Sequence, residues 1–217
     1  MRIGTWNLDA GWTRRHAAVL SDADCDVWLV TEMVDGVSLP GYAVHFCAAR
    51  MSPGQHYAAV LSRLAMEPLS DPHPASAAVR IDGLTFCSSV LPWRSKDDPL
   101  VWGDGDQGAR TTAAVQALRA SLIPAESVWG GDFNHPLVGS TRWCGSAAGR
   151  QAIEQLATSL GITMVTASLP GRLAGTCSID HIGVPTAWTI TEASRIALLP
   201  ALSDHDAYVV TASRETE

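Results

Sequence analysis

The chain has 217 residues and a mass of 23.0 kDa, and we expect residues 1–217 to form a single domain with a substantial core. Hydrophobic residues make up 47% and charged residues 17% of the sequence, a balance that excludes an intrinsically disordered chain. The formal net charge of −7 excludes an overall basic field that would attract nucleic acid, although a bound divalent metal can supply positive charge locally.

The sequence contains no apolar run long enough to cross a bilayer, and Met1 leads directly into strand-like residues without a signal-peptide pattern. The five cysteines are scattered without a Cys-x-x-Cys pair. This spacing favours reduced thiols packed as small hydrophobic side chains over a zinc site. We therefore expect a cytoplasmic protein without a membrane span, and we take it to be a monomer.

In the first half of the chain, short runs of alternating or continuous apolar residues predict strands. Thr13 is a candidate N-cap for a short helix over Arg14 to Leu20, and Asp82-Gly83 is a strong hairpin turn signal. A longer helix is predicted over Arg110 to Leu122, where apolar residues recur on one face. The predicted strands are Ile3 to Leu8, Val27 to Thr31, Tyr42 to Cys47, Tyr57 to Ser62, Ala77 to Ile81 and Leu84 to Leu91.

The second half begins with a predicted strand over Ser127 to Gly131 and a helix over Ala148 to Leu160, with Ser146 as N-cap and Gly161 as C-cap. The segment from Trp93 to Gly108, rich in Gly, Asp, Pro and Trp, is interpreted as a loop over a site. Many strands with interspersed helices and hairpins favour packed sheets covered by helices. The remaining predicted strands are Thr163 to Thr166, Ser178 to Val184, Trp188 to Ala193 and Tyr208 to Ala212.

Five of the strand-like segments carry polar residues near an end that a core strand does not need. Each one alone has a structural explanation, because Asp and Asn favour turns and a glutamate can face water. Five such positions in one chain are hard to explain by turns alone, and catalytic groups collect where loops meet a rigid sheet. The residues are Asn7, Glu32, Asp132 with Asn134, Asp180 with His181, and Asp204 with His205.

The segments that hold these residues resemble, in the same order, the signature blocks of the endonuclease/exonuclease/phosphatase superfamily, which includes DNase I, exonuclease III and inositol polyphosphate phosphatases. The blocks are TWN, the glutamate after a buried strand, LSR, GDFN, SIDHI and SDH, and they extend from Thr5 to His205. GDFN and SDH are the specific part when they occur together. The resemblance implies an α/β fold, a four-layer sandwich of two mostly antiparallel sheets flanked by helices.

The same resemblance implies a metal site. Hydrolysis of a phosphate ester needs an activated water and neutralisation of the phosphoryl oxygens, to which a bound metal contributes. Mg²⁺, with Mn²⁺ as a possible substitute, prefers hard oxygen ligands. Glu32 resembles the principal metal ligand of the family, with Asn7 beside it and Asp204 on the metal side.

Four further residues resemble the groups that act on water and phosphate. Asp132 resembles the residue that orients or deprotonates the attacking water, and Asn134 the amide that holds the phosphate and the aspartate in place. His205 resembles the histidine that faces the scissile phosphate. Asp180 resembles the carboxylate that bonds the far nitrogen of that ring and favours its charged form. We therefore expect Asp180 and His205 to act as a pair.

One position departs from the family pattern. After the strand at Leu84 to Leu91, relatives usually carry a histidine or tyrosine that contacts phosphate, whereas this chain reads SSVLPWR. The corresponding residue is Val90, which cannot donate to phosphate. We expect Arg94 and Arg110 to supply replacement charge and Trp93 to contribute to substrate binding. The departure leaves the substrate class and the level of activity open.

The sequence thus predicts a Mg²⁺-dependent hydrolase of phosphate esters, and a nuclease is favoured because Trp93, Trp102 and Trp143 lie in predicted loops where they can stack on bases. Core packing is an equally good interpretation of these tryptophans. The alternatives are a phosphatase or phosphodiesterase of a small phosphorylated metabolite or lipid headgroup, and a catalytically silent binding module. The Val90 departure motivates the silent module, which ranks below the enzyme because the residues that organise metal and water remain. An AP endonuclease is less favoured, because Cys177 stands where those enzymes often carry an aromatic residue.

Overall fold

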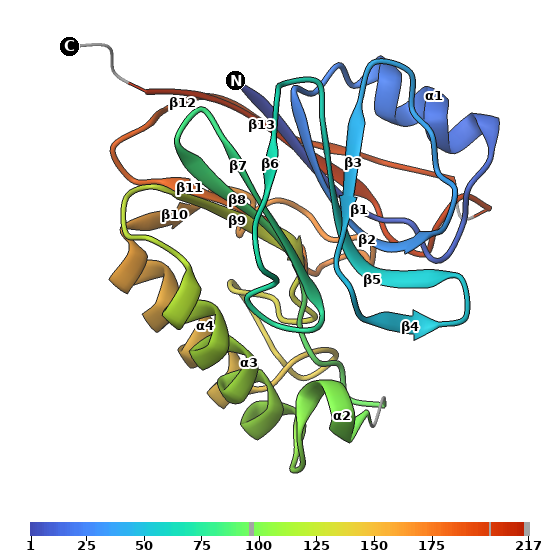
Figure 1. Ribbon diagram of the computed structural model, residues 1–217. Coiled ribbons are helices and arrows are strands. Elements are labelled where there is room, and N and C mark those ends of the chain that lie inside the picture. Colours follow the sequence, from blue (N-terminus) through green and yellow to red (C-terminus); the bar gives the residue numbers. More distant parts are fainter. Residues whose placement is uncertain (96–97, 200, 215–217) are drawn as a thin grey trace.

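The computed structural model describes residues 1–95, 98–199 and 201–214 and consists of two β-sheets packed face to face (Figure 1). The first sheet contains β1 (Arg2–Asn7), β2 (Val27–Val34), β3 (Ala43–Phe46), β4 (Arg50–Ser52), β5 (Gln55–Ser62), β12 (Thr189–Ile196) and β13 (Ala207–Ser213). The second sheet contains β6 (Glu67–Pro68), β7 (Ser76–Ile81), β8 (Leu84–Val90), β9 (Ser127–Asp132), β10 (Ile162–Met164) and β11 (Asp180–Pro185).

Helices cover the outer face of each sheet, so the predicted four-layer α/β sandwich is confirmed (Figure 1). Helix α1 (Arg14–Asp22) lies against the first sheet, and α3 (Gln107–Ser121) and α4 (Ala147–Leu160) lie side by side on the second. The short α2 (Pro99–Trp102) precedes α3. None of the helices in the described ranges combines the length and the apolar character that a membrane span requires.

Each sheet contains one parallel strand pair, and the other pairings among the described strands are antiparallel. Strand β1 runs parallel to β2, and β8 runs parallel to β9. A parallel pair needs a crossover, which α1 provides in the first sheet and α3 in the second. Both sheets are therefore built around a strand–helix–strand unit whose two strands end at the same edge.

The core consists of one layer between the sheets and one beneath the helices on each side. Consecutive residues of β9 show how the layers divide, because Val128 packs between the sheets and Trp129 packs beneath α3 and α4. Beneath α1, the fully buried Trp6 and Trp28 pack with Leu20. The alternating apolar patterns that predicted the strands correspond to these faces.

The helix ends follow the capping signals in the sequence. The Thr13 hydroxyl accepts a hydrogen bond from the Arg15 N–H, and Ser146 caps α4 in the same way. Gly161 has a φ of 62° and ends α4 in the left-handed conformation. Helix α3 begins three residues earlier than predicted, at Gln107, because the side chain of Asp106 caps it by accepting from Ala109 N at 2.9 Å.

The predicted loop from Trp93 to Gly108 contains more structure than expected, although residues 96 and 97 lie outside the described part. It includes α2 and the first turn of α3. Trp102 in α2 is only 2% exposed, and its ring stacks on His73 and meets Tyr57 edge-on. The interpretation of Trp102 as a base-stacking loop residue is therefore wrong, because its ring belongs to the core between the sheets.

The paired glycines at the end of β9 allow that strand to lie close to both of its neighbours. A Cβ atom at Gly130 would lie 2.5 Å from the carbonyl oxygen of His181 in β11, and one at Gly131 would lie 2.2 Å from the carbonyl oxygen of Ser89 in β8. Gly131 also has a φ of 122°, which side chains rarely adopt. Both glycines are thus required by the backbone that carries Asp132.

We predict that Gly131→Ala destabilises the fold by about 3 kcal/mol, because backbone strain and a clash with Ser89 add together. Gly139→Ala is the matched control, since its φ of 80° is also positive but nothing lies within 4 Å of the added Cβ. The control should lose only about 1 kcal/mol. Urea unfolding followed by circular dichroism measures both, and equal losses would show that the contact with Ser89 does not matter.

Candidate active site

The sheet topology brings six of the predicted site residues to one edge of the sandwich. Strands β1 and β9 end there, Glu32 lies in β2 beside the end of β1, and β11 and β13 start there in the opposite direction. Asp180 at the start of β11 lies directly opposite Asp132 at the end of β9. The six residues are Asn7, Glu32, Asp132, Asn134, Asp180 and His205.

Asn7 joins the two sheets at this edge. Its Nδ2 donates to Glu32 Oε1 at 2.9 Å and to Asp132 Oδ2 at 3.0 Å, and its Oδ1 accepts from Asp9 N at 2.9 Å. The residue is 1% exposed, so each polar atom of the carboxamide has a partner where an unpaired one would be costly. Asn7 therefore sets the separation between a carboxylate of the first sheet and one of the second.

Asn134 holds Asp132 from the other side. Its backbone N–H donates to Asp132 Oδ1 at 2.9 Å, and its Nδ2 donates to Asp132 Oδ2 at 3.1 Å and to Leu91 O at 3.0 Å. The φ of Asn134 is 52°, in the left-handed region that asparagine tolerates better than most residues. The D-F-N sequence thus forms a turn in which Asn134 orients the carboxylate of Asp132.

The environment of Asp132 makes it a weak acid with a pKa near neutrality. Burial raises the pKa of this carboxyl to about 7, the nearby His205 opposes that rise, and the negative charges of Asp180 and Glu32 add to it. Asp132 is 2% exposed and accepts three hydrogen bonds from Asn7 and Asn134. Such a group can both accept and release a proton near pH 7.

His205 lies between the two buried aspartates. Its Nδ1 donates to Asp180 Oδ2 at 2.8 Å, and its Nε2 lies 3.9 Å from Asp132 Oδ2. Burial lowers the pKa of His205, but the attraction of Asp180 and Asp132 outweighs it and raises the pKa well above the ordinary value. The ring is therefore charged at neutral pH, with Nε2 on the side of Asp132.

The backbone next to His205 is tied to the first sheet through Ser203. The Ser203 hydroxyl accepts from His205 N at 2.9 Å and donates to Asn7 O at 2.7 Å. Because Asn7 also bonds Asp132, the histidine and the carboxylate are positioned from the same strand end. This arrangement explains why a serine precedes Asp204 and His205 in the S-D-H sequence.

Three acidic side chains, one of them Glu32 from the group itself, lie toward its more exposed part. The Asp204 side chain is 75% exposed, with Oδ1 3.7 Å from His205 Nε2. Burial raises the pKa of Glu32, and burial together with repulsion from Asp204 raises the pKa of Asp9. Asp9 was not among the predicted residues, although the TWNLD sequence places it two residues after Asn7, where its own backbone N–H bonds that side chain.

The donor set at this border fits a hard divalent cation. Burial is the largest cause of the raised pKa of Glu32, and the negative charges of Asp204 and Asp9 add to it, so a bound cation would offset carboxylate charge at this border. Glu32 also has a φ of 53° within a strand, a strained conformation of the kind found at functional sites. Among the described residues, one atom each from Asp132, Asp180 and His205 forms a second group, all within 4.8 Å of one another.

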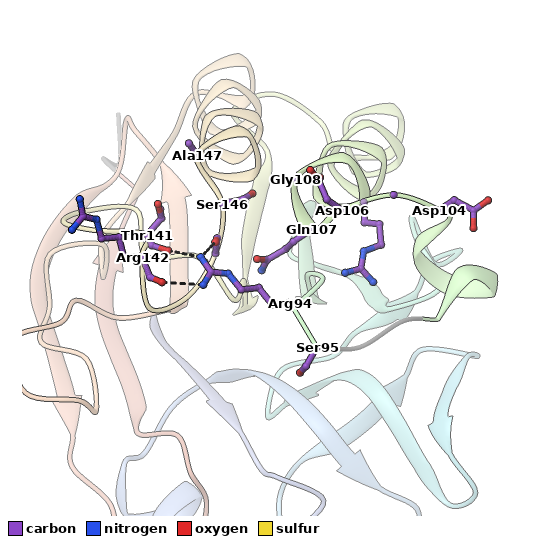
Figure 2. Close-up of a pocket in the computed structure, with 13 residues that line it drawn as sticks. Arg94, Ser95, Asp104, Asp106, Gln107, Gly108, Thr141, Arg142, Ser146 and Ala147 are labelled. Carbon is purple, nitrogen blue, oxygen red and sulfur yellow. Dashed lines mark hydrogen bonds between the residues drawn. The ribbon is translucent and has the colours of Figure 1, made fainter.

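Two of the three predicted substrate-binding residues, Arg94 and Arg110, line a cavity of about 720 Å³ at the N-terminal ends of α3 and α4 (Figure 2). The guanidinium group of Arg94 donates to the carbonyl oxygens of Arg142, Thr141 and Gly145 at 2.8–2.9 Å. Arg110 Nη2 donates to Trp93 O at 3.3 Å, and Trp93 packs partly buried against the inter-sheet core. Their role in substrate binding stays a prediction.

Comparison with solved structures shows the same fold in proteins of very different sequence. The chain superposes with a TM-score of 0.71 on an endonuclease/exonuclease/phosphatase protein from Beutenbergia cavernae, at 14% identity over 97% of this chain and 70% of that one. The AP endonuclease LMAP of Leishmania major gives 0.70 at 12% identity, covering 99% and 88% of the two chains. The endonuclease domain of TRAS1, a telomere-specific non-LTR retrotransposon, gives 0.65 at 18% identity, covering 98% and 97%.

These similarities define the fold. No family sequence profile matches the chain, and comparison with curated protein sequences gives no significant match. The structure nevertheless has the fold of the endonuclease/exonuclease/phosphatase superfamily, as its signature blocks predicted. Two of the solved proteins that share it are named as endonucleases, and a group of two carboxylates and a histidine stands at the sheet edge of this chain.

We predict that Asp180→Asn lowers the pKa of His205 by at least about one pH unit, because the closest negative charge is removed from its ring. A raised histidine pKa contributes stability below the unfolded-state value near 6.5, and that contribution is lost as the pH rises through the folded-state pKa. The variant should therefore lose this contribution at a lower pH than the unchanged protein.

Titration of the His205 ring by nuclear magnetic resonance measures this change directly. Asp204→Asn is the matched control. The Asp204 carboxylate is exposed, and its Oδ1 lies 3.7 Å from His205 Nε2, which is too far for a hydrogen bond. Solvent screening should make its effect the smaller of the two. Equal shifts in the two variants would mean that Asp180 has no special place beside the ring.

Proposed function

We propose that the protein is a metal-dependent phosphoesterase that hydrolyses phosphodiester bonds of nucleic acid. The observation that supports this best is the pairing of a carboxyl group with a pKa of about 7 and a charged imidazole 3.9 Å apart, at the edge of a fold shared with endonucleases. Such hydrolysis needs two groups from side chains: a base that accepts a proton from the attacking water, and a cation that stabilises the charge on the phosphoryl oxygens. At this separation the two groups do not bond each other directly, so each can bond a group that lies beside both.

Asp132 is the base in this proposal. Asn7 and Asn134 donate hydrogen bonds to its two carboxylate oxygens, and these bonds keep the carboxylate from rotating away from the site. A pKa near 7 leaves a large fraction deprotonated at neutral pH and still allows the carboxylate to take a proton from water. The attacking water would approach Asp132 Oδ2, the oxygen that also faces His205 Nε2.

His205 is the phosphate-binding cation in this proposal. Its Nδ1 proton is held by Asp180, so Nε2–H is the donor that remains for a phosphoryl oxygen. The network of Asp180 and Ser203 fixes the ring before substrate arrives. Preorganised donors of this kind stabilise developing charge without reorganisation at the moment of reaction.

The proposed metal ion is Mg²⁺, with Mn²⁺ able to substitute, and Glu32 and Asp204 would hold it, with Asn7 and Asp9 beside them. When bound, it supplies positive charge to the phosphoryl oxygens. Few protein ligands suffice, because Mg²⁺ keeps several of its waters. A cation at this place also balances a chain whose net charge is −7 and whose site is lined by carboxylates.

Nucleic acid is preferred over a small phosphorylated metabolite or a lipid headgroup. The TRAS1 domain and the Leishmania major protein, both named as endonucleases, share the fold over nearly the whole of this chain. Val90 is completely buried in β8, so its side chain cannot make the phosphate contact that relatives make at this position. A polynucleotide substrate should lose affinity steeply with rising salt, and a small substrate should not.

We predict that Asp132→Asn lowers kcat on a single-stranded DNA or RNA substrate by about 100- to 10,000-fold while substrate affinity changes little, because an amide cannot take a proton from water. Asp82→Asn is the matched control at the opposite edge of the same sheet, in the turn between β7 and β8, and it should retain full activity. Undiminished turnover by the Asp132 variant would exclude it as the base.

We predict that Glu32→Gln weakens Mg²⁺ binding at least about tenfold while the fold stays intact, because the neutral amide removes a charged oxygen ligand. Isothermal titration calorimetry measures the affinity, and circular dichroism monitors the fold. The control is Glu154→Gln on the exposed face of α4, which should bind Mg²⁺ like the unchanged protein. If both variants bind Mg²⁺ equally well, the metal is held by other residues.

A further inference from the structure

A second cavity opens directly beside His205. Its volume is about 380 Å³, within the range of about 300–1,000 Å³ typical of small-molecule sites. Asp180 and His205 line it, so any group bound there adjoins the proposed reaction centre. Its outer wall comes from two loops, one between β9 and α4 and the other before β11, and contains Trp143, Arg172, Leu173 and Ile179.

Trp143 is an exposed aromatic residue on a loop that is held firmly. The residue is 37% exposed, yet Arg94 donates to three carbonyl oxygens of the loop, all of them within two residues of Trp143 (Figure 2). The thiol of Cys144 also donates to Asn134 O at 3.1 Å. An aromatic side chain presented by a fixed loop loses little entropy on binding.

A buried carboxylate, that of Asp206, holds the guanidinium group of Arg172 in place. Its Nη1 donates at 2.8 Å to Asp206, which is 1% exposed and also accepts from Arg195 Nε at 2.8 Å and Leu198 N at 2.8 Å. Within the described part of the chain, every hydrogen bond of Arg172 is made by Nη1. Its Nε and Nη2 are left to donate to a ligand, and two arginines share the charge of one aspartate.

We propose that this cavity binds the nucleoside attached to the scissile phosphate, with Trp143 stacking on the base and Arg172 donating to a base or sugar oxygen. The inference rests on the proposed function and names its substrate class. A base in such a cavity has left the stack of a double helix, which costs least where the strand is unpaired. The preferred substrate is therefore single-stranded nucleic acid or an unpaired chain end.

The chemistry of the wall supports a nucleoside over other phosphate esters. Leu173, 58% exposed, and Ile179 add apolar surface next to the aromatic ring, which suits the face of a base. An inositol phosphate would bring further phosphates close to Asp204, the exposed carboxylate that lines the cavity. That carboxylate disfavours a second anionic group, whereas a neutral base and sugar meet no such repulsion.

Hydrolysis of two esters that differ only in the nucleoside tests the proposal. We predict that Trp143→Ala lowers kcat/KM at least about tenfold on thymidine 5′-(p-nitrophenyl phosphate), because one stacked base is lost, and leaves methyl p-nitrophenyl phosphate within about twofold. Trp143→Phe should restore most of the loss, and Arg172→Ala should show the same selectivity as Trp143→Ala. Leu100→Ala, which removes an apolar side chain that is 94% exposed elsewhere, is the control.

The two esters also separate failure of this inference from failure of the proposed function. Turnover of both esters with equal effects of Trp143→Ala, or with none, overturns the nucleoside site and leaves the phosphoesterase standing. If the unchanged protein hydrolyses neither ester, the proposed function fails. Calorimetric binding of thymidine 5′-monophosphate then decides the site independently: it should weaken at least about tenfold in Trp143→Ala, and an unchanged affinity overturns the inference.

Discussion

The site depends on one hydrogen-bonded carboxamide that connects the two sheets. Asn7 at the end of β1 donates to Glu32 within its own sheet and to Asp132 in the other. Each of these bonds involves a carboxylate, and bonds to charged groups contribute about 1.5–3 kcal/mol, more than neutral ones. The layer between the sheets is mostly apolar, although Ser88 Oγ of β8 also donates to Val30 O of β2 at 2.8 Å, so polar contacts such as those of Asn7 specify the relative position of the two sheets.

The cost of burying carboxylates at that edge shapes the rest of the site. Asp132 and Asp180 are both almost completely buried, and burial raises the pKa of each. His205 offsets part of that cost because its positive charge lies next to both. The same proximity raises the pKa of the histidine, so one arrangement places a carboxyl group with a pKa of about 7 beside a charged imidazole.

Arginine side chains organise the surroundings rather than the centre. Arg94 holds the loop that carries Trp143, and Arg172 and Arg195 hold the segment after His205 through Asp206. In both cases planar guanidinium groups bind several oxygen atoms at once, which suits them to fixing irregular backbone. The walls of the cavity beside His205 are thus supported by charged contacts that do not belong to the proposed chemistry.

The sequence alone predicted the longer strands, the main helices, their caps and six polar residues that the fold brings to one edge, because apolar periodicity, capping residues and signature blocks are local properties of the chain. Thr13, Ser146 and Gly161 all act as predicted. Only the tertiary structure showed that Trp102 is buried, that Arg94 binds loop carbonyls and that Asp9 and Asp206 border the site. These outcomes depend on which distant segments meet, and neither burial nor the partner of an arginine is encoded in its immediate neighbours.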